Sequence, residues 1–173
     1  MSKGNNFVIK LHGSCNWKSF DDSDTMVIGR GKKSKILKEP LLRCYFEIFE
    51  KVLCEGSHNL IVIGYGFRDK HINSVLAKAV KKGLKIYILS HGSPGTFKEN
   101  LLKDYEDNED RSYEDKKNRE IIWEGLAGYS QYVEEVLKGY SRDSVKKRQF
   151  YKIVFGSEKY EYYLLCGGPK QKY

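Results

Sequence analysis

Long hydrophobic runs are missing from this sequence of 173 residues. No stretch approaches the roughly 18 consecutive apolar residues that a membrane-spanning helix needs. The opening residues, MSKGNNFVIKLHG, also lack the charged, apolar and cleavage regions of a secretory signal peptide. We therefore expect a cytoplasmic chain without a membrane segment.

Cysteine is scarce, and the sequence contains no Cys-x-x-Cys pair. The four cysteines are widely scattered, at Cys15, Cys44, Cys54 and Cys166. This pattern indicates neither a zinc ribbon nor a disulfide framework. The four histidines likewise include no pair with metal-ligand spacing. We expect reduced thiols and no bound metal.

The composition is that of a soluble globular protein, with 40% hydrophobic and 31% charged residues. Its length suits a single domain. The formal net charge of +8 comes from lysines spread along the chain. Such an excess attracts nucleic acid or an anionic nucleotide, or it belongs to an ordinary solvated surface. The lysine clusters lack interleaved aromatic residues, which favours the solvated surface over nucleic-acid binding.

The centre of the sequence reads as a strand, a helix and a second strand. Leu60 to Ile63 is a continuous apolar run, as in strands covered on both faces of a parallel sheet. Asp69 is a suitable N-cap for the helix that follows, and Gly83 suits its end. Lys85 to Leu89 supplies the next strand. The unit predicts an α/β fold with a parallel, partly Rossmann-like sheet and flanking helices.

The N-terminal part predicts two further strands and a helix. Phe7 to Leu11 is apolar and β-branched, and it stops at a turn that begins with His12. Thr25 to Gly29 reads as a second short strand. Apolar residues recur at helical spacing between Pro40 and Cys54, with proline allowed in the first turn. That helix should be amphipathic.

The C-terminal part has a different character. Asn100 to Arg119 is dense in mixed charge, which predicts an exposed helix or a mobile connection. Tyr129 to Leu137 has helical spacing of its apolar residues. Phe150 to Phe155 and Tyr160 to Cys166 flank a four-residue turn and predict a β-hairpin.

The turn Gly64-Tyr65-Gly66 is the first candidate site. It leaves a buried parallel strand and enters a helix, which is where open α/β sheets bind ligands. Glycine lets the main chain approach a ligand, and the N–H groups of the helix N-terminus favour phosphate. The alternative is that both glycines serve only a tight turn, because the third glycine of the dinucleotide fingerprint is missing.

His12 is the second candidate. At the end of the predicted strand, and followed by Gly13 and Ser14, its imidazole is expected at the edge of the sheet. A histidine there is suited to act as a general base near neutral pH. A hydrogen-bonded structural histidine is the alternative reading.

The two turns, taken in order, resemble a known family. LHGSCNW (11–17), followed by LIVIGYGFRDKHIN (60–73), is similar to the sirtuin-like NAD-binding domain, specifically its zinc-free bacterial and phage-defence branch. The resemblance implies that His12 activates a ribose hydroxyl or water. It implies that residues of the two turns and one serine after the next strand contact the nucleotide; these are Gly13, Ser14, Gly64, Tyr65, Gly66 and Ser90.

The departures from the family pattern shape the expected activity. The family's glycine-rich diphosphate turn and its asparagine and aspartate motif stand upstream of the histidine, and only eleven residues precede His12 here. We therefore expect either the C-terminal portion of such a domain from a longer gene product or a truncated form that cannot complete the site. Gly66 also replaces a serine often found at that turn. Without zinc-ribbon cysteines deacylation is not expected, and the zinc-free branch implies hydrolysis of NAD to nicotinamide and ADP-ribose.

These expectations divide the chain into three regions. Residues 1–95 would form the C-terminal part of the NAD-binding domain, 96–140 a charged helical extension, and 141–173 the hairpin. The expected function is NAD hydrolysis, with a role as a defence effector. The alternative is a catalytically incomplete module that binds NAD or an ADP-ribose-like nucleotide, or that assembles with a second copy or a partner protein.

Overall fold

The computed structural model describes residues 9–19, 21–55, 58–103, 113–130 and 162–166. The chain forms two compact units, Met1–Val52 and Leu53–Tyr173. Within the described ranges, no helix is long and apolar enough to cross a membrane.

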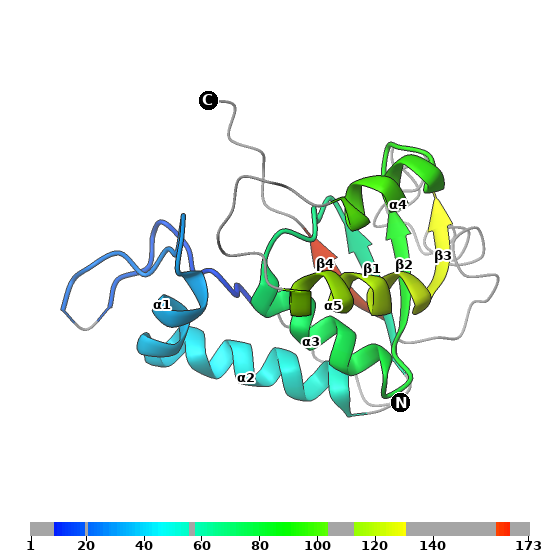
Figure 1. Ribbon diagram of the computed structural model, residues 1–173. Coiled ribbons are helices and arrows are strands. Elements are labelled where there is room, and N and C mark those ends of the chain that lie inside the picture. The colour runs from blue at the N-terminus through cyan, green and yellow to red at the C-terminus, as the bar shows by residue number, and fades with distance from the viewer. Residues whose placement is uncertain (1–8, 20, 56–57, 104–112, 131–161, 167–173) are drawn as a thin grey trace, which may run out of the picture. The chain divides into compact units, whose positions relative to one another are not determined.

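The second unit contains a four-stranded sheet in the order β3-β2-β1-β4 (Figure 1). Every neighbouring pair of strands runs parallel. The strands are β1 (Asn59–Ile63), β2 (Lys85–Leu89), β3 (Leu126–Ser130) and β4 (Tyr162–Cys166). The expected α/β class with a parallel, partly Rossmann-like sheet is therefore confirmed.

The unit of strand, helix and strand forms as its sequence predicts. The middle three residues of β1 are at most 4% exposed, as the continuous apolar run requires. Helix α3 (Lys70–Val80) follows with Asp69 at its N-cap, although the Asp69 side chain makes no capping hydrogen bond. Gly83 takes a φ of 100°, which lets the chain leave α3 and enter β2.

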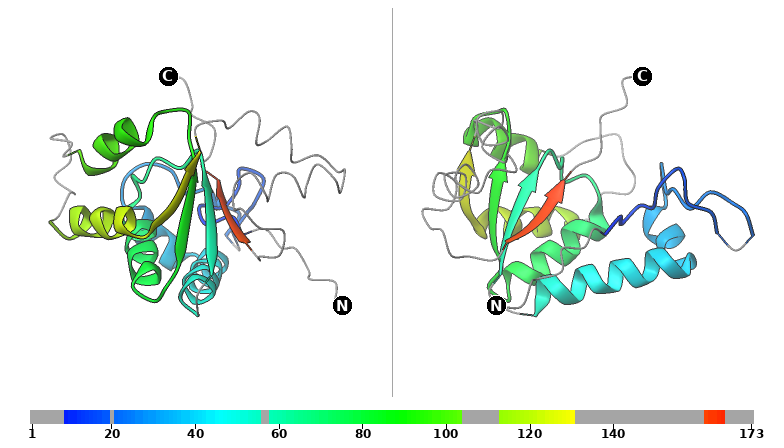
Figure 2. Two further views of the ribbon diagram at one scale, coloured as in Figure 1. Left: turned by 90° about the vertical axis from the view of Figure 1, so that its right-hand side faces the viewer. Right: turned by 180° about the vertical axis from the view of Figure 1, so that it is seen from behind.

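Two more helices connect β2 with β3. Helix α4 (Pro94–Leu102) begins with proline in its first turn, and Ser93 caps it by accepting a hydrogen bond from the Thr96 N–H at 3.2 Å. Helix α5 (Tyr113–Glu124) packs against α3 and also contacts α4. Figures 1 and 2 show α3 and α5 on the same face of the sheet. The charged region thus contains a helix, but Asp115 and Arg119 are buried in it rather than exposed.

The structure corrects the helix expected from Tyr129 onwards. Tyr129 and Ser130 belong to β3, which pairs with β2; residues 131–137 lie outside the described ranges. Gly128 explains the close packing here, because a Cβ at this position would lie 2.7 Å from Cδ1 of Tyr87. A glycine inside a strand often marks such an approach, and it was the available signal for β3.

The predicted C-terminal hairpin is only partly within the described residues. Its second strand is present as β4, and the partner that the structure describes for it is β1, alongside which it runs parallel. The first strand of that hairpin, residues 150–155, lies outside the described ranges. The hairpin itself stays a prediction.

The first unit contains helix α1 (Lys32–Lys38) and all but the last two residues of α2 (Pro40–Cys54), and α2 has the bounds that its apolar spacing predicts. The two strands expected in the N-terminal part are not formed by the described residues. Residues 9–11 and 25–29 form no strand, and residues 7–8 lie outside the described ranges. A strand requires a ladder of hydrogen bonds. Among the described residues, the Val27 N–H donates to the His12 carbonyl at 2.8 Å, but residues 9–11 and 25–29 build no ladder.

Candidate functional site

The structure separates the predicted site residues into two groups. His12, Gly13 and Ser14 belong to the first unit. The turn Gly64-Tyr65-Gly66 and Ser90 belong to the second, where they follow β1 and β2 directly. The predicted site residues therefore form a histidine turn, residues 12–14, in the first unit and a sheet edge in the second.

The histidine turn is closed by a main-chain hydrogen bond and by a hydrogen bond between two side chains. The Gly13 N–H donates to the Lys10 carbonyl at 3.0 Å, and Lys10 Nζ donates to Ser14 Oγ at 3.1 Å. Gly13 takes a φ of +74°. His12 is half-buried, and its carbonyl is held by Val27 as described above. His12 thus stands in a turn with a defined backbone rather than at the end of a strand.

Gly13 has no room for a side chain. A Cβ there would lie 2.2 Å from the carbonyl oxygen of Thr25, which is main chain and cannot swing aside. The left-handed φ adds about 1–2 kcal/mol for any L-residue with a side chain, and an overpacked site about 1–3 kcal/mol. Gly13→Ala should therefore destabilise the first unit by about 2–5 kcal/mol, measured by urea denaturation followed through Trp17. Gly29→Ala is the control, because Gly29 has a similar φ of +80° but no atom within 4 Å of its Cβ position; equal losses in both variants would contradict the steric argument.

The sheet edge is formed by the carboxyl ends of the parallel strands. Ile63 pairs with Leu89 of β2 on one side and with Cys166 of β4 on the other. Gly64 and Ser90 therefore leave the sheet at the same edge, and the Ser90 N–H donates to the Ser130 carbonyl at 3.0 Å. The chain proceeds from β1 to β2 and β3 on one side, whereas β4 lies on the other side of β1. Such a change in strand order is where open α/β sheets bind their ligands.

The turn after β1 presents its main chain outwards. Gly64 and Gly66 are exposed, and no atom of the described residues lies within 4 Å of a Cβ built at Gly64. Gly64 has a φ of +65° and Phe67 a φ of +53°. Phe67 is buried, at 4% exposure, and its ring lies 4.7 Å from that of Tyr65. The aromatic side chains therefore pack inwards while the glycine faces stay open.

Arg68 extends this turn and was not singled out from the sequence. Its side chain is exposed, and its Cγ lies 3.9 Å from the position that a Gly66 Cβ would take. The arginine stem thus runs beside the open face of Gly66. An arginine next to exposed main chain at a helix N-terminus suits an anionic group.

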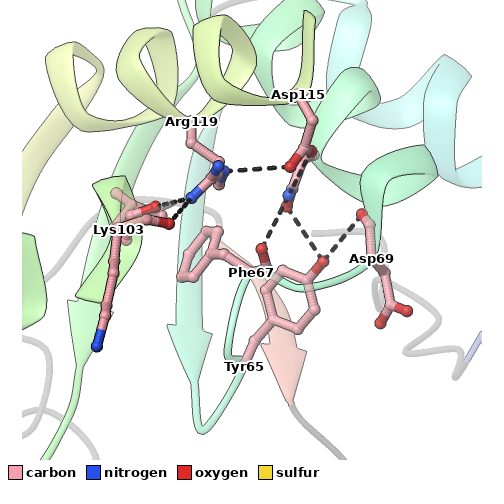
Figure 3. A network of polar contacts seen from close by, with 8 residues as sticks. Tyr65, Phe67, Asp69, Lys103, Asp115 and Arg119 are labelled. Carbon is pink, nitrogen blue, oxygen red and sulfur yellow. Dashed lines mark hydrogen bonds and ion pairs between the residues drawn. The ribbon is translucent and has the colours of Figure 1, made fainter. Parts of the chain in front are cut away.

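A buried polar network lies behind the turn (Figure 3). The Tyr65 hydroxyl lies 3.2 Å from Asn73 Oδ1 and 3.4 Å from the Asp69 carbonyl. Asn73 Nδ2 donates to the Phe67 carbonyl at 2.9 Å and to Asp115 Oδ1 at 3.2 Å. Asn73 is fully buried. One amide therefore joins the turn, α3 and α5.

Arg119 continues the network to α4. Its Nε lies 3.2 Å from Asp115 Oδ2, an ion-pair distance at which the N–H is not aligned for a hydrogen bond. Its Nη1 donates to the carbonyl of Leu101 and, at 3.2 Å, to that of Lys103. Asp115 and Arg119 are 6% and 3% exposed. The guanidinium therefore caps the C-terminal end of α4 while it neutralises a buried carboxylate.

Burial raises the pKa of Tyr65 well above its ordinary value, and the negative charge of Asp69 raises it further. Tyr65 is consequently protonated at neutral pH and acts as a donor in the network. Because its hydroxyl is used within the protein, contact of this residue with a nucleotide would come from its main chain.

Aromatic rings continue from the turn along the sheet edge. Phe67 lies 5.7 Å from Phe97 of α4, and Phe97 lies 5.6 Å from Tyr129 of β3. The Tyr129 hydroxyl donates to the Gly92 carbonyl at 2.6 Å. These contacts fix the segment that follows Ser90 against the sheet edge.

One residue of the sequence indicates this network, although the spacing of the apolar residues does not reveal it. Asn73 falls on the apolar side of α3, beside Ile72 and Leu76. A polar residue on a buried face needs hydrogen-bond partners. Its partner Asp115 is 42 residues away in the sequence, so the pairing itself was not predictable.

In the part of the chain that the structure describes, no group of three or more His, Cys, Asp or Glu side chains is placed to hold a metal ion. A family model for the SIR2-like domain matches residues 1–122. Comparison with curated proteins and with solved structures gave no match. The family match covers the histidine turn, the Gly64 turn and Ser90, whereas β3 and β4 lie beyond it.

Proposed function

The chain belongs to the SIR2-like domain family, whose members generally bind NAD, and on that premise we propose that it binds NAD and hydrolyses it to nicotinamide and ADP-ribose. The single observation that carries the binding proposal is the open main chain of Gly64 and Gly66 at the carboxyl end of β1. This turn would hold the diphosphate, with the N-terminus of α3 and Arg68 supplying positive charge. Ser90, at the same edge, would lie near the adenosine ribose.

His12 would supply the chemistry. Hydrolysis breaks the bond between the nicotinamide nitrogen and the ribose, and nicotinamide leaves with the bonding electrons. Water adds to the ribose carbon, and its proton passes to the His12 imidazole acting as general base. Gly13 and Ser14 would position this turn against the nucleotide. We place the chain in the zinc-free branch of the family and propose a role in bacterial defence against phage.

Binding is tested with ADP-ribose and NAD by titration calorimetry, and hydrolysis by release of nicotinamide from NAD. Gly66→Ala is the most informative variant for binding. Its backbone φ is not left-handed, and its Cβ would meet only Arg68 Cγ at 3.9 Å, so the free protein should keep its stability. A methyl group on the face that receives the diphosphate should weaken ADP-ribose binding about tenfold or more.

The control for Gly66→Ala is Gly95→Ala, in the first turn of α4, where the nearest atom is likewise 3.8 Å away. Equal affinity of all three proteins for ADP-ribose would contradict binding at the turn. Absence of binding by the wild-type chain would remove the proposed function.

A second function is favoured by the division of the site residues between two compact units. Binding at the sheet edge does not itself require the histidine turn, so a module that binds nucleotide without turnover is the alternative. Large apolar side chains of the first unit, including Ile28 at 52% and Leu41 at 43%, are also exposed, which suits assembly with a second copy or a partner protein. Light scattering with and without ADP-ribose separates these cases.

A further inference from the structure

The network behind the turn explains how a strained backbone is kept in one conformation. Phe67 takes a left-handed φ of +53° although it is not glycine. Such a residue persists only where its surroundings fix it. Here the Phe67 carbonyl accepts a hydrogen bond from Asn73 Nδ2, and its ring is buried against Tyr65. Both contacts depend on where the Asn73 amide is held.

The Asn73 amide is itself oriented by its neighbours. Nδ2 donates to both Phe67 and Asp115, and Oδ1 accepts from Tyr65. A reversed amide would place an oxygen against a carbonyl and a carboxylate, and an N–H group against a hydroxyl. The carboxylate of Asp115 thereby fixes which end of the amide faces the turn, and Arg119 holds Asp115.

We propose that Asn73 and Asp115 are positioning residues, which hold the Gly64 to Phe67 turn in the conformation that receives the nucleotide diphosphate. They act through the turn and do not touch the ligand. The proposal rests on the proposed function for its ligand, and on the buried amide contacts for its structural part. It assigns a role in affinity to two residues on α3 and α5 that were not singled out as site residues from the sequence.

The decisive variant is Asn73→Asp, which keeps the shape of the side chain but removes the donor to the Phe67 carbonyl. It also sets two carboxylates side by side. The double variant N73D/D115N removes that repulsion and restores a donor and an acceptor between positions 73 and 115. It still leaves the Phe67 carbonyl without its donor, so it separates general stability from the shape of the turn. Asn118→Asp on α5, outside the network, is the control for the added charge.

Two measurements compare these variants with the wild type. Hydrogen exchange of the amides of residues 64–68 reports the turn without any ligand, and calorimetry reports the affinity for ADP-ribose. N73D should increase exchange in the turn and weaken ADP-ribose binding, each about tenfold, while β2 stays protected. N73D/D115N should regain only the part of the thermal stability that the carboxylate repulsion costs in N73D, because residue 115 no longer pairs with Arg119, and it should regain neither turn protection nor affinity. N118D should match the wild type in both measurements.

Wild-type exchange across the turn in both N73D and the double variant would overturn the proposal. So would recovery of turn protection and affinity in parallel with thermal stability, since that is the behaviour of a merely structural residue. If N73D does not fold, Asn73→Ser removes the same donor without adding charge. A wild-type chain that does not bind ADP-ribose, but whose turn loosens in these variants, would remove the proposed function and support the structural part alone.

Discussion

Arg119→Met should destabilise the second unit by about 3–5 kcal/mol, because it leaves a buried carboxylate without its partner. Asp115 is 6% exposed, and the Arg119 guanidinium is the cation that faces it at 3.2 Å. The variant also removes the donor to the Leu101 and Lys103 carbonyls at the end of α4. The loss is a large part of the roughly 5–15 kcal/mol that holds a typical domain together. Urea denaturation in a Trp17→Phe background, where Trp123 reports α5, measures it.

Two further variants serve as controls for Arg119→Met. Lys117→Met removes an exposed cation from the same helix and should change the free energy of unfolding by less than about 0.5 kcal/mol. The double variant D115N/R119M removes both charges and should recover part of the loss, because no uncompensated charge stays buried. A loss below about 1 kcal/mol in Arg119→Met alone would mean that the pair contributes little to stability.

The parts of the fold that could be predicted are those determined by local sequence. The apolar run of β1, the N-cap Asp69 and the spacing of α2 each depend on a few neighbouring residues, and the structure confirms the corresponding elements. Parallel pairing of β1 with β2 also follows, because a strand, a helix and a strand permit little else.

The errors arose where distant segments decide the structure. Residues 25–29 have the alternation of a strand, with Val27 buried and Ile28 exposed, but they form no ladder with the described residues 9–11. Tyr129 has helical spacing with its C-terminal neighbours, yet it enters β3 because the edge of β2 accepts a partner. Neither outcome is encoded within one segment.

The candidate site likewise combines a part that local sequence predicts with a part that depends on distant residues. The turn at Gly64 and Gly66 was predictable, because glycines between a buried strand and a helix have a defined meaning. The hydrogen bond of the Tyr65 hydroxyl within the protein was not predictable, because its partner Asn73 is itself hydrogen-bonded to Asp115 on α5. The roles assigned to His12, Ser90 and the turn in nucleotide binding stay predictions.

His12→Ala should lower the rate of nicotinamide release from NAD by about 10²–10⁴-fold, the usual contribution of a positioned general base. The substitution leaves the main chain in place, so the hydrogen bond from the Val27 N–H to the carbonyl of residue 12 persists. Because the diphosphate is proposed to bind at the Gly64 turn, the affinity for ADP-ribose should stay within about twofold to threefold of the wild type.

His58→Ala is the matched control for this variant. His58 directly precedes β1 at the amino end of the strand, opposite to the edge that carries Gly64. Its substitution should leave nicotinamide release unchanged. Equal rates in His12→Ala and the wild type would exclude His12 as the base. No release by the wild-type chain, together with measurable ADP-ribose affinity, would favour the nucleotide-binding module over the hydrolase, because the sheet edge would then work without the chemistry proposed for the histidine turn.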